Sequence, residues 1–218
     1  MHSIHYPTPT PIYRLLHVDN LHIYLQRRAL HAPNHTPNDG LPYKPIHNLD
    51  IQQQRQVKRL PCGPGGAIHD YVAFYFGYLS PMLLQLKTGQ VPGYNEGQEP
   101  LVYLVSSVQT IAQRQIGFAF SDGHGIAFDT HWYADIEDLD KVDWNMVYQR
   151  YWAADYEKDM DRQRRKQAEF LVHQRCDWSL IHEIGVLNDD MKMKVEQILA
   201  GFVPTMKRPV TLRPQWYY

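Results

Sequence analysis

Apolar residues along the chain fall into short runs that alternate with polar segments rich in proline and glycine. In "AIHDYVAFYFGYLSPML", Val72, Phe74 and Phe76 take every second position and alternate with tyrosine and alanine, which predicts a strand with apolar side chains on both faces. Further strands are predicted in "IYRLL", "LVYLVSS", "IGFAF", "AEFLVHQ", "HEIGVLN" and "RPVTLRP".

Apolar residues at helical spacing occur in fewer segments. Asp19 is the predicted N-cap of a helix through "NLHIYLQRR", and Asn188 or Asp189 is the predicted cap of a later one. Residues 32–50 are rich in Pro, Asn, Asp and Gly, which predicts a long surface loop of the kind that often carries function. Short strands with peripheral helices, without regular strand–helix alternation, indicate an α+β fold.

Composition narrows the class of protein. The chain has 218 residues and a mass of 25.6 kDa, with 44% hydrophobic and 21% charged residues, which suits a single ordered domain over residues 1–218. A formal net charge of −1 excludes the strong overall field that draws basic proteins onto nucleic acid. Binding to nucleic acid would therefore depend on local basic patches, and the sequence offers "RQVKR" (55–59) and "RQRRK" (162–166).

The spacing of cysteines and histidines argues against a metal centre. Cys62 and Cys176 are the only cysteines and form no CxxC motif, and the 12 histidines form no HExxH motif, so we expect no metal and no disulfide framework. No apolar run approaches the ~18 residues of a membrane span, and the N-terminus lacks the apolar core of a signal peptide. These features predict a soluble, cytoplasmic protein without membrane association.

Glu169 is the carboxylate whose position raises a chemical question, because it lies where a charged run turns into an apolar strand. On a continuous strand Gln167 and Glu169 would share one face, and a carboxylate beside an amide can bind a sugar hydroxyl and stabilise positive charge at an anomeric carbon. The residues alone favour a plainer interpretation, in which Glu169 is a solvated, ion-paired acid at the strand edge.

Arg55, Lys58 and Arg59 follow the long loop in a short polar segment. The planar guanidinium of Arg55 suits a phosphate or a base carbonyl, and the two cations after it suit a nucleic-acid backbone. A solvated helical face explains the same residues, and the sequence alone favours that interpretation.

Several motifs, taken in order, resemble one known family. "PIYRLLHVDNL", "GGAIHDYVAFYFGYLSPML", "EPLVYLVSS", "DGHG", "KQAEFLV" and the C-terminal "WYY" together resemble the DarT toxins, bacterial ADP-ribosyltransferases that modify DNA, over residues 9–218. The resemblance implies the ADP-ribosyltransferase fold, an α+β domain with split antiparallel sheets around an NAD cleft and peripheral helices. It also implies that ADP-ribose is transferred from NAD to thymidine in sequence-selected single-stranded DNA.

The resemblance assigns roles to individual residues. It implies that Glu169 is the catalytic glutamate and that Arg55 works with it. Arg14 stands at the NAD site where family members commonly have histidine. The other residues implied to bind NAD are His17, Asn20, Tyr75 and Met82.

The same resemblance implies the partners of the protein. Single-stranded DNA is the expected substrate, and the expected protein partner is a DarG-type antitoxin with a macrodomain that removes the modification. The residues expected to contact DNA are His124, Lys58, Arg59 and Arg165, the last within the basic run before Glu169. Leu79 and Ala73 depart from the arginine and proline that the family commonly has at these positions.

Other functions are compatible with the same residues. The acceptor can be guanosine in place of thymidine, or a protein in place of DNA, since Glu169 suits each of these reactions. A non-catalytic module that binds nucleic acid or nucleotides is the alternative from another class. These alternatives can be distinguished by incubating the protein with labelled NAD and finding which substrate becomes labelled.

Overall fold

The computed structural model describes residues 6–155 and 157–218, and its centre is one eight-stranded sheet. Every neighbouring pair in the sheet is antiparallel except β10 and β9, which are parallel. In spatial order the strands are β10 (Val210–Leu212), β9 (Glu183–Val186), β4 (Leu101–Ser107), β1 (Pro11–His17), β3 (Tyr71–Tyr75), β7 (Glu169–His173), β5 (Phe118–Ser121) and β6 (Trp132–Tyr133).

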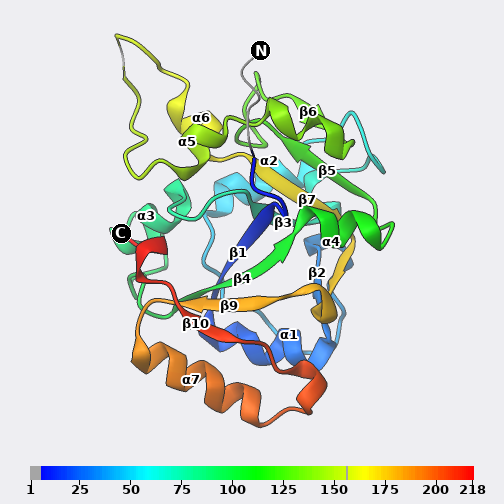
Figure 1. Cartoon of the computed structure of the whole chain (residues 1–218), viewed down its shortest axis with the longest axis vertical. Helices are drawn as coiled ribbons and strands as arrows, with labels where there is room; N and C mark the ends of the chain where they lie inside the picture. The colour runs from blue at the N-terminus through cyan, green and yellow to red at the C-terminus, as the bar shows by residue number, and fades with distance from the viewer. Residues whose placement is uncertain (1–5, 156) are drawn as a thin grey trace.

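The sheet is split between β1 and β3. β1 pairs with β4 along its whole length, and β3 pairs with β7 along its whole length. In contrast, β1 and β3 share a single register pair, Tyr13 opposite Tyr75. Figure 1 shows the two half-sheets, β10-β9-β4-β1 in the lower part and β3-β7-β5-β6 in the upper part. The split sheets expected from the sequence are therefore present, and they remain joined at one point.

Helices surround the sheet and cover its two ends. α7 packs on β9 and β10 at the lower end, whereas α5 and α6 lie beside one another at the upper end (Figure 1). A second sheet, of two strands, is formed by β2 (Ala29–His31) and β8 (Arg175–Asp177). The helices are α1 (Leu21–Arg27), α2 (Leu49–Val57), α3 (Pro81–Lys87), α4 (Val108–Gln113), α5 (Trp144–Tyr148), α6 (Arg162–Lys166) and α7 (Asp189–Ala200).

Aromatic side chains fill the core on both faces of the sheet. Phe76 contacts the rings of Phe120, Trp144 and Phe170, with centroids 5.2 to 6.0 Å apart. All four side chains are buried, so the end of β3, the start of β7 and α5 are fixed relative to one another. This packing leaves the first residue of β7 at the margin of a rigid core.

The strands predicted from apolar alternation are confirmed, with one difference in length. β3 ends at Tyr75, whereas the pattern predicted a strand that continued towards "SPML". Ser80 instead caps α3 through a hydrogen bond to the Leu83 N–H, and Pro81 occupies the first turn. Proline is favoured there because the first helical N–H groups have no partner within the helix.

The predicted helix caps are partly confirmed. The side chain of Asn188 accepts a hydrogen bond from the Met191 N–H and caps α7. The prediction of Asp19 as the cap of α1 is wrong. The chain enters α1 through a 3₁₀ turn, Val18–Asn20, whose cap is the His17 ring accepting from the Asp19 N–H.

The predicted strand pair of Gln167 and Glu169 is also wrong. β7 begins at Glu169, and Gln167 is the C-terminal cap of α6, with its amide donating to the Gln163 carbonyl. The short helix α6 has no apolar periodicity, so the pattern gave no reason to separate it from the strand.

No helix in the described part of the chain is both long and apolar enough to cross a membrane.

Lys166 is a buried lysine bound only by backbone oxygens. Its Nζ donates to the carbonyls of Val147 and Gln149, at 2.6 and 2.7 Å, and ties the segment after α5 to α6. Burial lowers the pKa of Lys166 to about 8, from an ordinary value of 10.5.

A pH dependence of stability follows from this lysine. Between about pH 8 and pH 10.5 the unfolded chain binds more protons at this position than the folded chain, so its contribution to stability rises with pH. We expect Lys166→Met to abolish this rise, which amounts to about 3 kcal/mol at most. Urea unfolding of both proteins from pH 7 to 10.5 measures it. The exposed Lys207→Met is the control, and an identical pH profile for Lys166→Met and the wild type would contradict the expectation.

Candidate active site

A cavity of about 640 Å³ opens where β1 and β3 diverge. Its size suits a small molecule or a nucleotide cofactor. Residues from β1, β3, α2 and the loop before α2 line it, together with His124 and Glu169. Much of the loop at 32–50, predicted to carry function, forms one wall of this cavity.

Glu169 is held at the inner end of this cavity by three hydrogen bonds. It is the first residue of β7, lies opposite Tyr75 in the sheet, and has a side chain that is 3% exposed. Arg55 binds both carboxylate oxygens, Nη1 to Oε1 at 3.0 Å and Nη2 to Oε2 at 2.7 Å. The Gly125 N–H donates to Oε1 at 2.8 Å. Two residues 114 positions apart thus form one bidentate pair, which excludes the solvated strand edge as the place of Glu169.

Hydrogen bonds near Arg55 and near Glu169 fix the positions of these two side chains. Asn48 caps α2 by accepting from the N–H groups of Asp50 and Ile51, and this helix carries Arg55 in its last turn. The Ser121 hydroxyl accepts from the Glu169 N–H at 3.3 Å and donates to the Gly123 carbonyl at 2.6 Å. The turn after β5 is therefore fastened to the start of β7.

One acceptor position of Glu169 is left over. A carboxylate oxygen has two lone pairs, and Oε1 accepts from both Arg55 and Gly125. Oε2 accepts only from Arg55. One lone pair of Oε2 is thus available to a hydroxyl group in the cavity.

Burial determines the charge of the groups around Glu169. Burial alone would lower the pKa of Arg55, but the adjacent Glu169 carboxylate outweighs it and raises this pKa. Burial, with Glu169 in addition, raises the pKa of Tyr75 to about 12. Burial also lowers the pKa of His124, although Glu169 opposes this. At neutral pH the charged pair of Arg55 and Glu169 therefore lies among neutral rings.

Of the five residues predicted to bind NAD, four line the cavity and one does not. Tyr75, Met82 and Arg14 line the cavity, and the Tyr75 hydroxyl lies 3.8 Å from the Met82 sulfur. Asn20 lines it too, but its amide is bonded to the backbone N–H and carbonyl of Lys44, at 2.7 and 2.8 Å. Asn20 thus fixes the loop that forms the wall.

His17 lies outside the residues that line the cavity. Its side chain is 1% exposed, Nδ1 accepts from the Asp19 N–H, and Nε2 lies 3.3 Å from a Glu96 carboxylate oxygen. The ring therefore connects the start of α1 to the loop that carries Glu96. His17, predicted to contact NAD, thus has a partner near each of its ring nitrogens in this structure.

Of the residues predicted to contact DNA, His124 lines the cavity, and its backbone N–H donates to the Arg164 carbonyl. Lys58 and Arg59 follow α2 directly, outside the cavity lining. Within residues 6–155 and 157–218 neither of them has an ion-pair partner. Both cations remain available to a phosphate.

Arg165 corrects the sequence-based interpretation of the basic run. Its guanidinium forms ion pairs with Asp143, Asp159 and Asp161, the last at 3.2 Å. Arg164 is bound in the same way by neighbouring aspartates, and Lys166 by carbonyls. These side chains hold the 143–166 region together, and carboxylates occupy the groups that were expected to bind DNA phosphates.

Some cavity residues were not found by sequence reasoning. His69 lies 3.1 Å from the Gln52 amide oxygen, and burial lowers the pKa of both His69 and His47. Tyr43 also lines the cavity. His47 and Tyr43 lie in the loop that the sequence predicted to be functional. That prediction covered the whole loop and did not identify individual residues.

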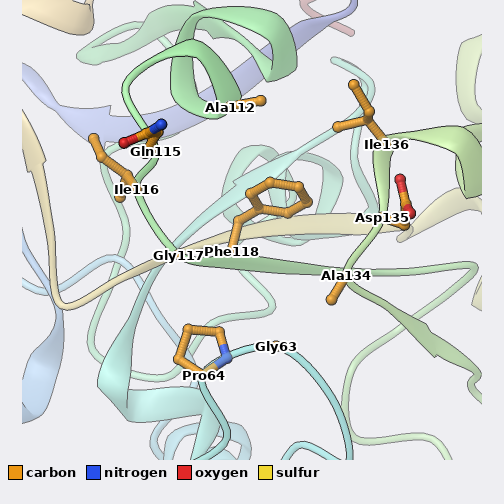
Figure 2. Close-up of a pocket in the computed structure, with 10 residues that line it drawn as sticks. All are labelled: Gly63, Pro64, Ala112, Gln115, Ile116, Gly117, Phe118, Ala134, Asp135 and Ile136. Atoms are coloured by element: carbon orange, nitrogen blue, oxygen red, sulfur yellow. The ribbon is translucent and has the colours of Figure 1, made fainter.

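A second, more open depression of about 450 Å³ lies elsewhere, and Figure 2 shows its lining. Pro64 lies below Phe118 in this view, and Asp135 and Ile136 lie to the right (Figure 2). Its single charged residue is Asp135, and it contains none of the predicted site residues. The cavity with Glu169 is therefore the candidate active site.

A split antiparallel sheet around a cavity, with a buried glutamate at the start of a central strand, defines an ADP-ribosyltransferase. Residues 13–218 match the family model described as ssDNA thymidine ADP-ribosyltransferase, DarT. The chain belongs to the DarT family.

One known protein and two solved structures show the extent of this similarity. A DNA ADP-ribosyl transferase of Thermus sp. (strain 2.9) is 39% identical over 214 residues, 98% of each chain. The structure of Thermus sp. 2.9 DarT in complex with ADP-ribosylated ssDNA has a TM-score of 0.90, with 98% of both chains covered and 39% identity. That of Thermus sp. 2.9 DarT in complex with NAD⁺ has a TM-score of 0.86 at 36% identity, covering 98% of this chain and 100% of the other.

Metal ligands are not gathered anywhere in the described residues, where no three His, Cys, Asp or Glu side chains could hold one ion together. The co-substrate NAD fits the cavity by volume and by the free acceptor on Glu169.

Gly125 provides a direct test of the carboxylate position. A Cβ at this residue would lie 2.4 Å from Glu169 Oε1, so Gly125→Ala displaces the flexible carboxylate and not the backbone. We expect about a 100-fold loss of ADP-ribose transfer, since small misplacements of catalytic groups have effects of this order, with a protein that still unfolds cooperatively on heating. Gly201→Ala is the control, because its Cβ would meet nothing nearer than 3.5 Å. Full activity of Gly125→Ala would refute the assigned geometry.

Proposed function

We propose that the protein transfers ADP-ribose from NAD to thymidine in single-stranded DNA, with Glu169 and Arg55 as its catalytic residues. The observation that carries this assignment is the buried Glu169, bound by Arg55 and Gly125 inside the cavity. Membership of the DarT family supports the substrates. The geometry supports the roles of the residues.

Glu169 acts first on the bond between ribose and nicotinamide. The free lone pair of Oε2 accepts a hydrogen bond from the 2′-hydroxyl of the nicotinamide ribose. The fixed carboxylate then stabilises positive charge at the anomeric carbon as nicotinamide leaves with the bonding electrons. This stabilisation is stronger in a cavity that excludes water than it would be at the surface.

Arg55 and Glu169 act together on the acceptor base. The thymine ring nitrogen forms the new bond to the anomeric carbon, and its proton passes to Glu169 Oε2, whose free lone pair the 2′-hydroxyl has by then released. Each terminal nitrogen of Arg55 has a second N–H beyond the one that binds Glu169. These donors suit a thymine carbonyl oxygen, where negative charge develops as the ring nitrogen loses its proton.

Single-stranded DNA is the substrate that the depth of the site favours. Glu169 is almost fully buried, so a base reaches it only when it is unstacked and unpaired. His124, neutral at physiological pH, lines the path to Glu169. Lys58 and Arg59 are the cations that suit the phosphate backbone, in place of the ion-paired Arg165.

The biological role follows from the resemblance to the DarT toxins. We place the protein in a toxin–antitoxin pair, with a DarG-type macrodomain protein as the partner that removes ADP-ribose from DNA. Growth arrest on expression, relieved by co-expression of such a macrodomain, is the outcome that this role requires.

Substitution of Glu169 tests both the reaction and the acceptor. Glu169→Gln keeps the size of the side chain and removes its charge, and we expect about a 100- to 1,000-fold fall in transfer. Mass spectrometry of oligonucleotides after incubation with NAD measures the adduct and its base. Glu183→Gln, which alters an ion pair with Arg213 away from the cavity, is the matched control. Adducts on thymidine-free oligonucleotides, or on protein alone, would identify guanosine or protein as the acceptor instead.

The proposed phosphate contacts of Lys58 and Arg59 can be tested through the salt dependence of DNA affinity. Replacing both by glutamine removes two phosphate contacts, so the slope of log affinity against log salt for single-stranded DNA falls by about 1.4. Fluorescence anisotropy with a labelled oligonucleotide measures this slope. The double variant Lys192→Gln, Lys207→Gln, altered at and after α7, is the control. Equal slopes for the two double variants would exclude Lys58 and Arg59 from the DNA interface.

A further inference from the structure

Arg14 lies at the split of the sheet and lines the cavity. Its Nη1 donates to the Ala73 carbonyl at 2.8 Å and so bridges β1 and β3. Its Nε is buried and has no hydrogen-bond partner among the described residues. Buried donors in folded proteins nearly always have a partner, so this one calls for an explanation.

No carboxylate in the described residues forms an ion pair with Arg14, although Arg55 on the same cavity is paired with Glu169. A guanidinium stays charged at all physiological pH values. A charge on a cavity wall without a counter-ion is disfavoured unless a ligand supplies one. Arg14 therefore offers the cavity a positive charge that the protein itself does not neutralise.

Two neighbouring residues also favour the binding of an anion beside Arg14. The Tyr43 hydroxyl is a second buried polar group without a partner in this part of the structure, and it also belongs to the cavity lining. Burial lowers the pKa of His47, and the charge of Arg14 lowers it further, so His47 adds no competing charge at neutral pH. Two unsatisfied donors thus adjoin one cavity.

We propose that Arg14, assisted by the Tyr43 hydroxyl, binds the diphosphate of NAD, an inference that rests on the proposed function. The diphosphate is the one anionic part of NAD, whereas adenine and the riboses are neutral and the nicotinamide ring is positive. Arg14 attracts the diphosphate and Glu169 attracts the nicotinamide ribose, so the two opposite charges orient the molecule in the cavity. Arginine at this position supplies a permanent charge where family members commonly have histidine.

Binding of two probes tests the assignment. Arg14→Gln keeps an N–H donor for the Ala73 carbonyl but removes the charge, and Tyr43→Phe removes only the hydroxyl. Calorimetry with ADP-ribose should show a 10- to 100-fold weaker affinity for Arg14→Gln, the effect of losing a charge-assisted hydrogen bond, and a smaller loss for Tyr43→Phe. Adenosine, which has no phosphate, should bind within about twofold of the wild type in both variants. Arg114→Gln, at an exposed arginine, is the control.

The outcomes separate this inference from the proposed function. Equal losses for ADP-ribose and adenosine, or no loss for ADP-ribose, would overturn the role of Arg14, even if the wild type modifies DNA. Should Arg14→Gln not fold, the wild type still decides, because its affinity for ADP-ribose must fall with salt more steeply than its affinity for adenosine. Failure of the wild type to transfer ADP-ribose to any oligonucleotide would instead overturn the proposed function.

Discussion

The bidentate pair of Arg55 and Glu169 is the interaction on which the site depends. Each charge alone would be disfavoured at this depth, and each stabilises the other through two parallel hydrogen bonds. The pair forms because the sheet separates after the Tyr13–Tyr75 contact, which leaves room for α2 to reach the first residue of β7. The same separation creates the cavity, so the fold provides the space and the charged pair together.

The sequence predicted the parts of the fold that have a regular pattern. The alternation in β3 and the apolar runs of β1, β4 and β7 were sufficient to locate these strands, because each is buried on at least one face. Gln167 was misplaced because α6 is short, charged and without an apolar stripe. The pattern of apolar residues therefore predicts the elements that face the core. It does not predict elements that are stabilised by polar contacts with residues distant in the sequence.

The site itself was accessible from sequence mainly through resemblance. Residue types alone favoured a solvated Glu169, since no local signal shows that Arg55 lies beside it in the fold. Tyr43 and His47 were missed because an irregular loop has no periodicity from which a direction could be inferred. His17 matched a motif, and the structure adds that its ring connects two loops, which the motif alone does not reveal.

The aspartates around Arg164 and Arg165 affect how the protein would encounter DNA. A run of basic residues usually creates a field that attracts a polyanion from a distance and accelerates association. Here Asp122, Asp143 and Asp159 cancel that field within a few ångströms of its source. Association with DNA would therefore gain little speed from this run, and attraction of the strand would depend on cations outside it, such as Lys58 and Arg59.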